Sequence, residues 1–377
     1  MNKKILAAAL AASFVTSFAM ADVTLYGFMS GSVESVKASG GSATYPSQSR
    51  VEDENSRIGF KGNEDLGNGT QTIWQIENSL KNFANGGTND KGQAATLATR
   101  NTFVGLSNSS YGTVVAGYYD SAYKRLTTTN IGTNIMADTT ADTNAANAVV
   151  TRGDARLANS VHYLSPVWNG LQAAASWGAD ETYVGSGSQQ HDSFAVNYTY
   201  NALLVAAGYD HQGSTSVTFS SGVPSYGKHV VGADTQFSKL AASYKFETGT
   251  FLAGQFEHAE YGQVGASNMT QNDWTIAVSQ MIGDRATIKL SYNKLQDLKN
   301  AANPGDYDAK QWVLGGSYAL SKSTLLQAYY TQLTNNSLQN ADFGVAPIYT
   351  SGLGTSSAAL AAGSKLTALG VGLKVSF

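Results

Sequence analysis

The chain has 377 residues, a formal net charge of −3 and no cysteine, and only 14% of its residues are charged, against roughly a quarter in a typical soluble domain. The absence of cysteine excludes disulfides, zinc–thiolate sites and thiol catalysis. The slightly acidic charge argues against a protein that binds nucleic acid through a basic face.

The N-terminus has the features of a secretory signal peptide. Lys3 and Lys4 precede an apolar run over residues 5–18, and the small-residue sequence at 19–21 predicts cleavage before Asp22. The run is shorter than the roughly 20 residues that a membrane-spanning helix needs. We therefore expect residues 1–21 to be removed and residues 22–377 to form the mature domain. No later stretch is apolar over a comparable length, so any membrane contact is expected to involve strands.

From residue 22 onward, segments of about ten residues alternate apolar and polar positions, which is the period of a β-strand. In 285–293, for example, Ile288, Leu290 and Tyr292 share one face, while Lys289 and Asn293 share the other. The predicted strands number sixteen and are 23–36, 55–64, 70–80, 99–107, 112–120, 156–165, 170–179, 191–200, 202–211, 236–247, 250–260, 272–282, 285–297, 310–320, 323–333 and 365–377.

The connections between these strands alternate strictly between tight turns and long polar loops. The long loops include 37–54, 81–98, 121–155, 213–235 and 335–364, and all five prolines fall in connections. A soluble β-sandwich has no reason to keep this order, whereas the two rims of an outer-membrane barrel require it. The last strand must pair with the first, because an open edge in lipid leaves backbone groups unsatisfied. The sequence therefore predicts an all-β fold, a membrane-spanning antiparallel β-barrel of sixteen strands.

Several motifs along the mature chain are familiar. They are Asp22–Gly27, Ser56–Gly62 followed by Glu64–Gly69, Ile73–Glu77, Arg100–Leu106, Asn159–Pro166 and the terminal Phe377. Together they resemble the general porins of the neisserial and betaproteobacterial type. The resemblance implies a homotrimer in the bacterial outer membrane, surrounded by lipid and lipopolysaccharide, with the third extracellular loop folded inward to narrow each pore. It also implies insertion by the barrel-assembly machinery, which reads the C-terminal strand ending in Phe377.

The resemblance and the strand alternation both suggest residues that line the pore. Arg57 and Lys61 match the basic pore-wall residues of the second strand in this family, and Arg156 matches the one that opens the sixth strand. Alternation places Arg285 and Lys289 on the same water-facing side.

Acidic residues oppose these basic ones. The expected inward loop carries Asp138, Asp142 and Asp154, and Tyr118 stands where the family often has an arginine. Partial cancellation of the two charges predicts a weak preference for anions.

Catalytic and metal-binding patterns are absent from the sequence. The histidines at 162, 191, 211, 229 and 258 are isolated, and no nucleophile elbow occurs. We therefore expect no enzyme activity, no cofactor and no metal, and instead a passive channel for ions and small hydrophilic solutes. Two alternatives stay open. A substrate-specific channel for a sugar or carboxylate would show saturable block, and a soluble or surface-anchored all-β adhesin would need no detergent.

Overall fold

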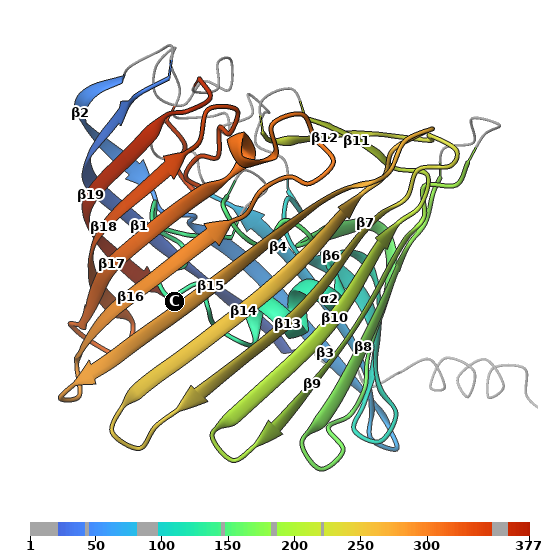
Figure 1. Ribbon diagram of the computed structural model, residues 1–377. Coiled ribbons are helices and arrows are strands. Elements are labelled where there is room, and N and C mark those ends of the chain that lie inside the picture. Colours follow the sequence, from blue (N-terminus) through green and yellow to red (C-terminus); the bar gives the residue numbers. More distant parts are fainter. Residues whose placement is uncertain are drawn as a thin grey trace, which may run out of the picture.

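A closed antiparallel β-barrel accounts for most of the chain (Figure 1). The computed structural model describes residues 22–41, 45–80, 97–144, 148–181, 187–219, 222–348 and 361–377. The predicted signal peptide, residues 1–21, lies outside the described residues. Within the part of the chain that is described, no helix is long and apolar enough to cross a membrane.

The barrel strands follow one another in chain order. They are β1 (Asp22–Ser39), β2 (Tyr45–Asp53), β3 (Arg57–Gly67), β4 (Thr70–Ser79), β5 (Thr102–Asn108), β6 (Gly112–Asp120), β7 (Arg156–Leu164), β8 (Leu171–Gly178), β9 (His191–Tyr200), β10 (Leu203–Gln212), β13 (Thr235–Lys245), β14 (Thr250–Tyr261), β15 (Met269–Ile282), β16 (Ala286–Leu295), β17 (Ala309–Ala319), β18 (Thr324–Asn335) and β19 (Lys365–Ser376). A separate two-stranded hairpin, β11 (Ser216–Phe219) and β12 (Pro224–Gly227), lies in the loop between β10 and β13.

β2 and β3 are two halves of one barrel strand. β2 pairs with the Gly31–Ala38 half of β1, and β3 pairs with the Asp22–Phe28 half. In the break between them, the Ser56 side chain accepts the N–H of Ser30 and donates to its carbonyl. The barrel therefore has sixteen strands, as predicted. The predicted loop over 37–54 is wrong, however, because β1 continues to Ser39 and β2 covers most of the remainder.

Closure of the barrel depends on β1 and β19. Their register runs from Phe28 opposite Ser376 to Ser39 opposite Lys365. Beyond this ladder, the N–H of Gly27 donates to the carbonyl of Phe377, and the N–H of Phe377 donates back to Gly27. The predicted pairing of the last strand with the first is confirmed.

Short turns gather at one end of the barrel and long loops at the other (Figure 1). The β3–β4 turn shows how the sequence makes such a connection. Asn68 and Gly69 form its two-residue loop with φ of 52° and 72°. Positive φ at both central positions is the backbone of a type I′ turn, which Asn-Gly favours.

Side chains on the outer surface are apolar, and those on the inner surface are largely polar. On β19, Leu369, Val371 and Leu373 are exposed on the outside. On β16, Leu290 is exposed, whereas Ser291 and Asn293 are buried on the inner side. This is the arrangement that a lipid-facing band and a polar lumen require.

Candidate functional site: the constricted lumen

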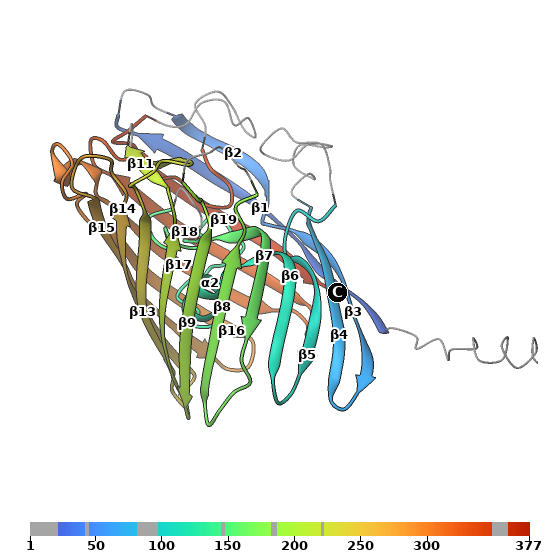
Figure 2. The ribbon, with the colours of Figure 1, turned by 90° about the vertical axis from the view of Figure 1, so that its right-hand side faces the viewer.

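The loop between β6 and β7 folds into the barrel over its described residues, 121–144 and 148–155. It begins with α2 (Ala122–Lys124) and the π-helical turn η1 (Arg125–Thr129). In two views at right angles, α2 lies within the outline of the barrel (Figures 1 and 2). The N–H of Ala122 donates to Ser176 on β8 at 2.8 Å, and that of Tyr123 donates to Ser193 on β9 at 2.9 Å. The prediction of an inward third loop is confirmed.

This third loop crosses the lumen close to the wall. A Cβ on Gly208 of β10 would lie 2.8 Å from Thr127, and one on Gly315 of β17 would lie 2.5 Å from the sulfur of Met136. Glycine at both positions therefore leaves space for the loop. Farther along, Thr140 donates to Glu34 of β1 at 3.1 Å. The loop thus reaches the wall opposite its origin and narrows the passage.

At the same wall, Asp138 forms ion pairs with Arg57 of β3 and with Lys374 of β19, the latter at 2.9 Å. Burial alone would raise the pKa of Asp138, but the positive charges of Arg57 and Lys374 outweigh burial and hold the pKa below its ordinary value. Asp138 is therefore ionised and neutralises part of the basic wall.

The other two predicted loop acids have different surroundings. Asp142 accepts bonds from Asn134 and from the N–H groups of Asp138 and Asn144, and burial raises its pKa to about 6. It organises the loop tip. The Asp154 side chain is only 7% exposed. Neither carboxylate presents an open face to the lumen, unlike the arrangement expected from sequence.

Asp154 belongs to a buried charge cluster that holds the end of the loop against the wall. Lys239 of β13 lies 2.8 Å from Asp154 and 3.1 Å from Glu257 of β14, and the Lys239 and Glu257 side chains are fully buried. Glu257 also accepts bonds from the Tyr123 hydroxyl and from the N–H of Gly153. Burial raises the pKa of Asp154, and the charge of Lys239 opposes that rise. Both ends of the loop are therefore fastened to β13 and β14.

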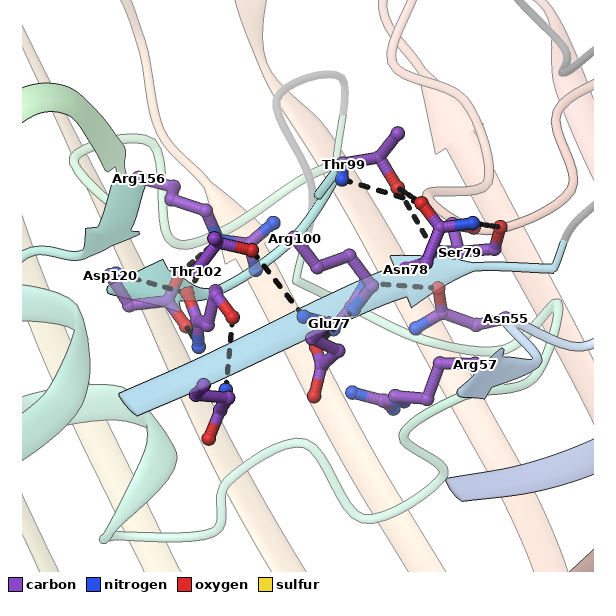
Figure 3. Close-up of polar contacts among 12 residues, drawn as sticks. Asn55, Arg57, Glu77, Asn78, Ser79, Thr99, Arg100, Thr102, Asp120 and Arg156 are labelled. Atoms are coloured by element: carbon purple, nitrogen blue, oxygen red, sulfur yellow. Dashed lines mark hydrogen bonds and ion pairs between the residues drawn. The ribbon is translucent and has the colours of Figure 1, made fainter. Parts of the chain in front are cut away.

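Three arginines form a row on the wall facing the loop (Figure 3). Arg57 comes from β3, Arg100 from the segment before β5, and Arg156 from β7. Burial, followed by the positive charge of Arg57, lowers the pKa of Arg100, and the charge of Arg156 acts in the same direction. The three guanidinium groups are therefore close enough to repel one another. We call Arg57, Arg100 and Arg156 the arginine row.

Each member of the arginine row has an acidic partner. Arg57 pairs with Asp138, Arg100 with Glu77 of β4, and Arg156 with Asp120 of β6 at 3.0 Å. Arg156 also donates to Asn101 at 2.8 Å. The partners fix the guanidinium planes without removing their donors from the lumen, since Arg57, Arg100 and Arg156 each keep 16% to 19% of the side chain exposed.

Further basic residues surround the row. Lys61 is exposed on β3 near the Tyr26 ring, and Arg125 of the third loop lies over the Tyr119 ring at 4.6 Å. Lys289 is half-buried on the inner face of β16. Arg285, in contrast, lies in the short turn before β16, so it is not on the pore wall as the predicted strand start implied.

One bulge alters the expected alternation near Arg156. The β6–β7 register shifts between Gly117 and Tyr119, and Asn159 has a positive φ of 49°. A bulge inserts one extra residue and reverses the side-chain faces beyond it. Leu157 is consequently buried, although alternation predicted that it faces lipid with Val161, which is indeed exposed. Arg156, the first residue of β7, is therefore positioned by its hydrogen bonds to Asn101 and Asp120 and not by the alternation from which it was predicted.

Two pore residues were missed by sequence reasoning. Arg100 has the same parity as the lipid-facing Val104 and Leu106, and only the irregular backbone before β5 turns it inward. No sequence signal indicated that turn. Lys374 could have been found, because it alternates with the lipid-facing Leu373 and Val375 of the last strand.

The first part of the loop between β18 and β19, residues 336–348, is also packed inside the barrel. Its residues Ala341, Phe343 and Ile348 form one buried apolar cluster with Val149 and Val150 of the third loop. The rest of the cluster comes from inward-facing positions at the loop ends of five strands and comprises Val36, Ala38, Leu295, Ala309, Leu333, Leu366 and Ala368. We call residues 336–348 the eighth-loop clasp.

Arg50 of β2 fastens this clasp to the wall. Its guanidinium donates to the carbonyls of Ala346 at 2.7 Å and Pro347 at 3.0 Å, and it also pairs with Glu34. Glu34 is the residue that accepts the bond from Thr140 of the third loop. The two inward loops therefore share one buried anchor.

A closed barrel with an apolar outer band, polar interior and loop-narrowed lumen is a channel for solutes across an outer membrane. Among the described residues, no group of three or more His, Cys, Asp or Glu side chains is placed to hold a metal ion.

Comparison with known proteins identifies the family of this channel. Residues 7–338 match the family model described as Gram-negative porin. The chain is 30% identical over 331 residues to the major outer membrane protein P.IB of Neisseria lactamica, covering 86% of this chain and 91% of that protein. Among solved structures, it resembles the anion-selective porin from Comamonas acidovorans with a TM-score of 0.70 at 23% identity, over 95% and 100% of the two chains. It also resembles OmpT of Vibrio cholerae in its trimer form, with a TM-score of 0.65 at 15% identity, over 95% and 99%.

The chain belongs to the Gram-negative porin family. It is an outer-membrane protein that forms a passive, water-filled channel.

Proposed function

We propose that this porin passes small hydrophilic solutes generally and favours anions weakly. The observation that carries the proposal is the arginine row beside the third loop. Its three charges are matched by Asp138, Glu77 and Asp120. Lys61 and Arg125 add positive charge to the same region and have no carboxylate within 4.0 Å among the described residues. A small net positive potential therefore remains.

The expected bias is modest for a physical reason. A unit charge about 5 Å from an ion in bulk-like water contributes roughly 1 kcal/mol or less, and salt at about 0.1 M screens it over about 10 Å. We therefore propose that five basic residues set the ion selectivity, namely Arg57, Lys61, Arg100, Arg156 and Lys289. Among the acidic residues, Asp138 offsets most of their positive charge. Asp142 and Asp154 are proposed to act on selectivity only indirectly, by fixing the loop.

The alternative is a channel specific for carboxylate solutes. The arginine row favours it, because planar guanidinium groups bind carboxylates in a forked geometry. The two functions differ in one measurement. In planar bilayers, a general pore passes a current that rises in proportion to salt concentration and is not saturably blocked by added sugars or carboxylates. Saturable block by one carboxylate class would establish the specific channel instead.

Maturation and assembly are expected to precede channel function in the outer membrane. We infer that residues 1–21 are removed before residues 22–377 insert, that the barrel-assembly machinery reads the strand ending in Phe377, and that the mature chain has no enzyme activity. We also infer that the mature chain forms a homotrimer in contact with outer-membrane lipid and lipopolysaccharide. The structure of OmpT supports the trimer by analogy, because that protein is described in a trimer form. An unheated gel band at trimer mass that collapses to monomer on boiling would support assembly, and identical bands at monomer mass would refute it.

A further inference from the structure

Four basic side chains of the lumen lie against aromatic rings of the barrel wall. From the ammonium nitrogen or guanidinium carbon to the ring centroid, the distances are 3.7 Å for Lys374 and Phe28, 4.5 Å for Arg57 and Phe28, 4.6 Å for Arg125 and Tyr119, and 5.3 Å for Lys61 and Tyr26. A cation within about 6 Å of a ring centroid is attracted by the negative face of the ring. We call Tyr26, Phe28 and Tyr119 the lumen rings.

The ring of Tyr26 is fixed in place and orients Lys61. Tyr26 faces the lumen, because it alternates on β1 with the lipid-facing Leu25. A Cβ on Gly59 of β3 would lie 2.3 Å from this ring, so the ring fills the space that a side chain at that position would need. The Tyr26 hydroxyl donates to Glu77 at 3.0 Å. The ring is therefore held from two sides, whereas the exposed side chain of Lys61 takes its position from the ring.

Tyr119 of β6 has the same relation to Arg125 of the third loop. Its ring contacts Phe103 of β5 and His162 of β7, with centroids 4.8 Å and 5.2 Å apart. His162 is buried and bonds to Ser176, which also accepts an N–H of the third loop, so Tyr119 lies inside the barrel. The two neighbouring rings hold Tyr119, and Arg125 lies over it from the loop side.

A ring and a carboxylate leave different fields for a passing ion. The carboxylates Asp138, Glu77 and Asp120 each carry a full negative charge and so cancel much of the field of the arginine row; Figure 3 shows Glu77 and Asp120 beside it. A ring attracts a cation through its quadrupole and has no net charge. Among the described residues, Lys61 and Arg125 have a ring but no carboxylate as partner. Their positive charge is therefore not cancelled.

Each of these two cations has a carboxylate nearby that it would reach if the ring were removed. Asp120 pairs at 3.0 Å with Lys124, the residue next to Arg125. Glu77 bonds to the hydroxyl of the ring that holds Lys61. Loss of either ring would therefore allow a new ion pair, which would lower the net positive potential of the lumen.

We propose that the rings of Tyr26 and Tyr119 determine the anion preference of the pore. They hold Lys61 and Arg125 on uncharged partners and so keep both charges available to ions in the lumen. This inference rests on the proposed function, in which the same two cations supply the net positive charge. The two rings are positioning residues, because they act on a passing ion through the cations. Phe28 has less influence, since both of its cations already pair with a carboxylate.

The test measures zero-current potentials across a potassium chloride gradient for the mature porin in planar bilayers. Y119L and Y26L should each lower the anion-to-cation permeability ratio by about twofold, within the roughly fivefold effect that one screened unit charge can have. Y119F and Y26F keep the ring and lose only the hydroxyl, so both should keep the wild-type ratio. Y198L removes an aromatic ring from the lipid-facing surface of β9 and should also keep it.

Double variants show whether each ring acts through its cation. Y119L should have no further effect in an R125Q background, and Y26L none in a K61Q background. A wild type without anion preference would count against the proposed function alone, because the inference is read from the difference between leucine and phenylalanine variants. The two sites are independent, so a variant that fails to insert at one site leaves the test at the other. Unchanged ratios in the leucine variants, equal losses in the phenylalanine variants, or losses that persist in the R125Q and K61Q backgrounds would overturn the proposal.

Discussion

Asp138 and Arg57 form an ion pair that joins the tip of the third loop to the barrel wall. Asp138 also neutralises Lys374, so one carboxylate offsets two positive charges of the lumen. D138N should therefore raise the anion-to-cation permeability ratio, by up to about fivefold (about 1 kcal/mol). Zero-current potentials across a potassium chloride gradient measure the ratio. The control is D284N, in an exposed short turn, and an unchanged ratio in D138N would mean that Asp138 lies outside the ion path.

The third loop should set the conductance of the channel. A sixteen-stranded barrel is wide enough to leave an aqueous channel, and the segment from Gly132 to Ala141 crosses it. Replacing residues 133–140 by a short Gly/Ser linker should raise single-channel conductance in planar bilayers. The helical turn and the Asp154 cluster are left intact, so the loop ends stay attached. A conductance equal to that of the wild type would show that this segment does not limit the passage.

The eighth-loop clasp should hold the third loop still. Phe343 packs with Val149 and Val150, and truncating a buried phenylalanine costs about 3 to 5 kcal/mol. F343A should therefore loosen both loops and increase the open-channel current noise. Leu290 is a matched control, because L290A removes a large side chain from the lipid-facing surface of β16. Noise that rises equally in both variants would argue against a specific coupling of the loops.

The docking of the clasp should depend on pH through Asp342. Burial raises the pKa of Asp342 to about 7. Hydrogen bonds from the N–H groups of Ile348 and Phe343, and the positive charge of Arg50, lower the pKa but do not outweigh burial. In an undocked, solvated loop this carboxyl has an ordinary pKa near 3.9. Between about pH 4 and pH 7 the docked state binds more protons, so docking weakens as pH rises, by at most about 1.4 kcal/mol per unit.

Hydrogen exchange measures this effect as protection factors for residues 338–348, corrected for the intrinsic rate at each pH. Protection should fall from pH 5 to pH 8 in the wild type, and the slope should flatten in D342N. Protection that rises with pH, or an equal slope in D342N, would contradict the assignment to Asp342.

The fold was predictable because strand alternation and turn chemistry are local. The alternation of short turns with long loops and the polar–apolar period of β16 need no tertiary context, and both were predicted correctly. Strand β2 was not predicted, because its outward positions do not form an apolar series. Its inward residue Arg50 bonds to β1 and to the eighth loop, and these contacts are not visible in the local sequence. Alternation also fails at a bulge, as Leu157 shows.

Much of the site depends on contacts between residues far apart in the sequence. Asp142 and Asp154 were expected to face water, but their burial follows from the path of the whole third loop, which no local pattern encodes. The sequence contains one signal for the eighth-loop clasp, because Leu366 and Ala368 are apolar although they occupy inward positions of the last strand. Apolar residues on a lumen face require something to cover them, so this signal was available in the sequence.

The arginine row is the centre of the functional account, and its charge is best tested by ion selectivity. Zero-current potentials across a potassium chloride gradient are measured for the wild type, for R57Q/R100Q/R156Q, and for a control with three basic residues at the short-turn rim replaced, K245Q/R285Q/K322Q. We expect a wild type with a few-fold preference for anions, a control close to it, and an arginine variant at or beyond neutrality. A strongly cation-selective wild type, or an arginine variant with unchanged selectivity, would contradict the account.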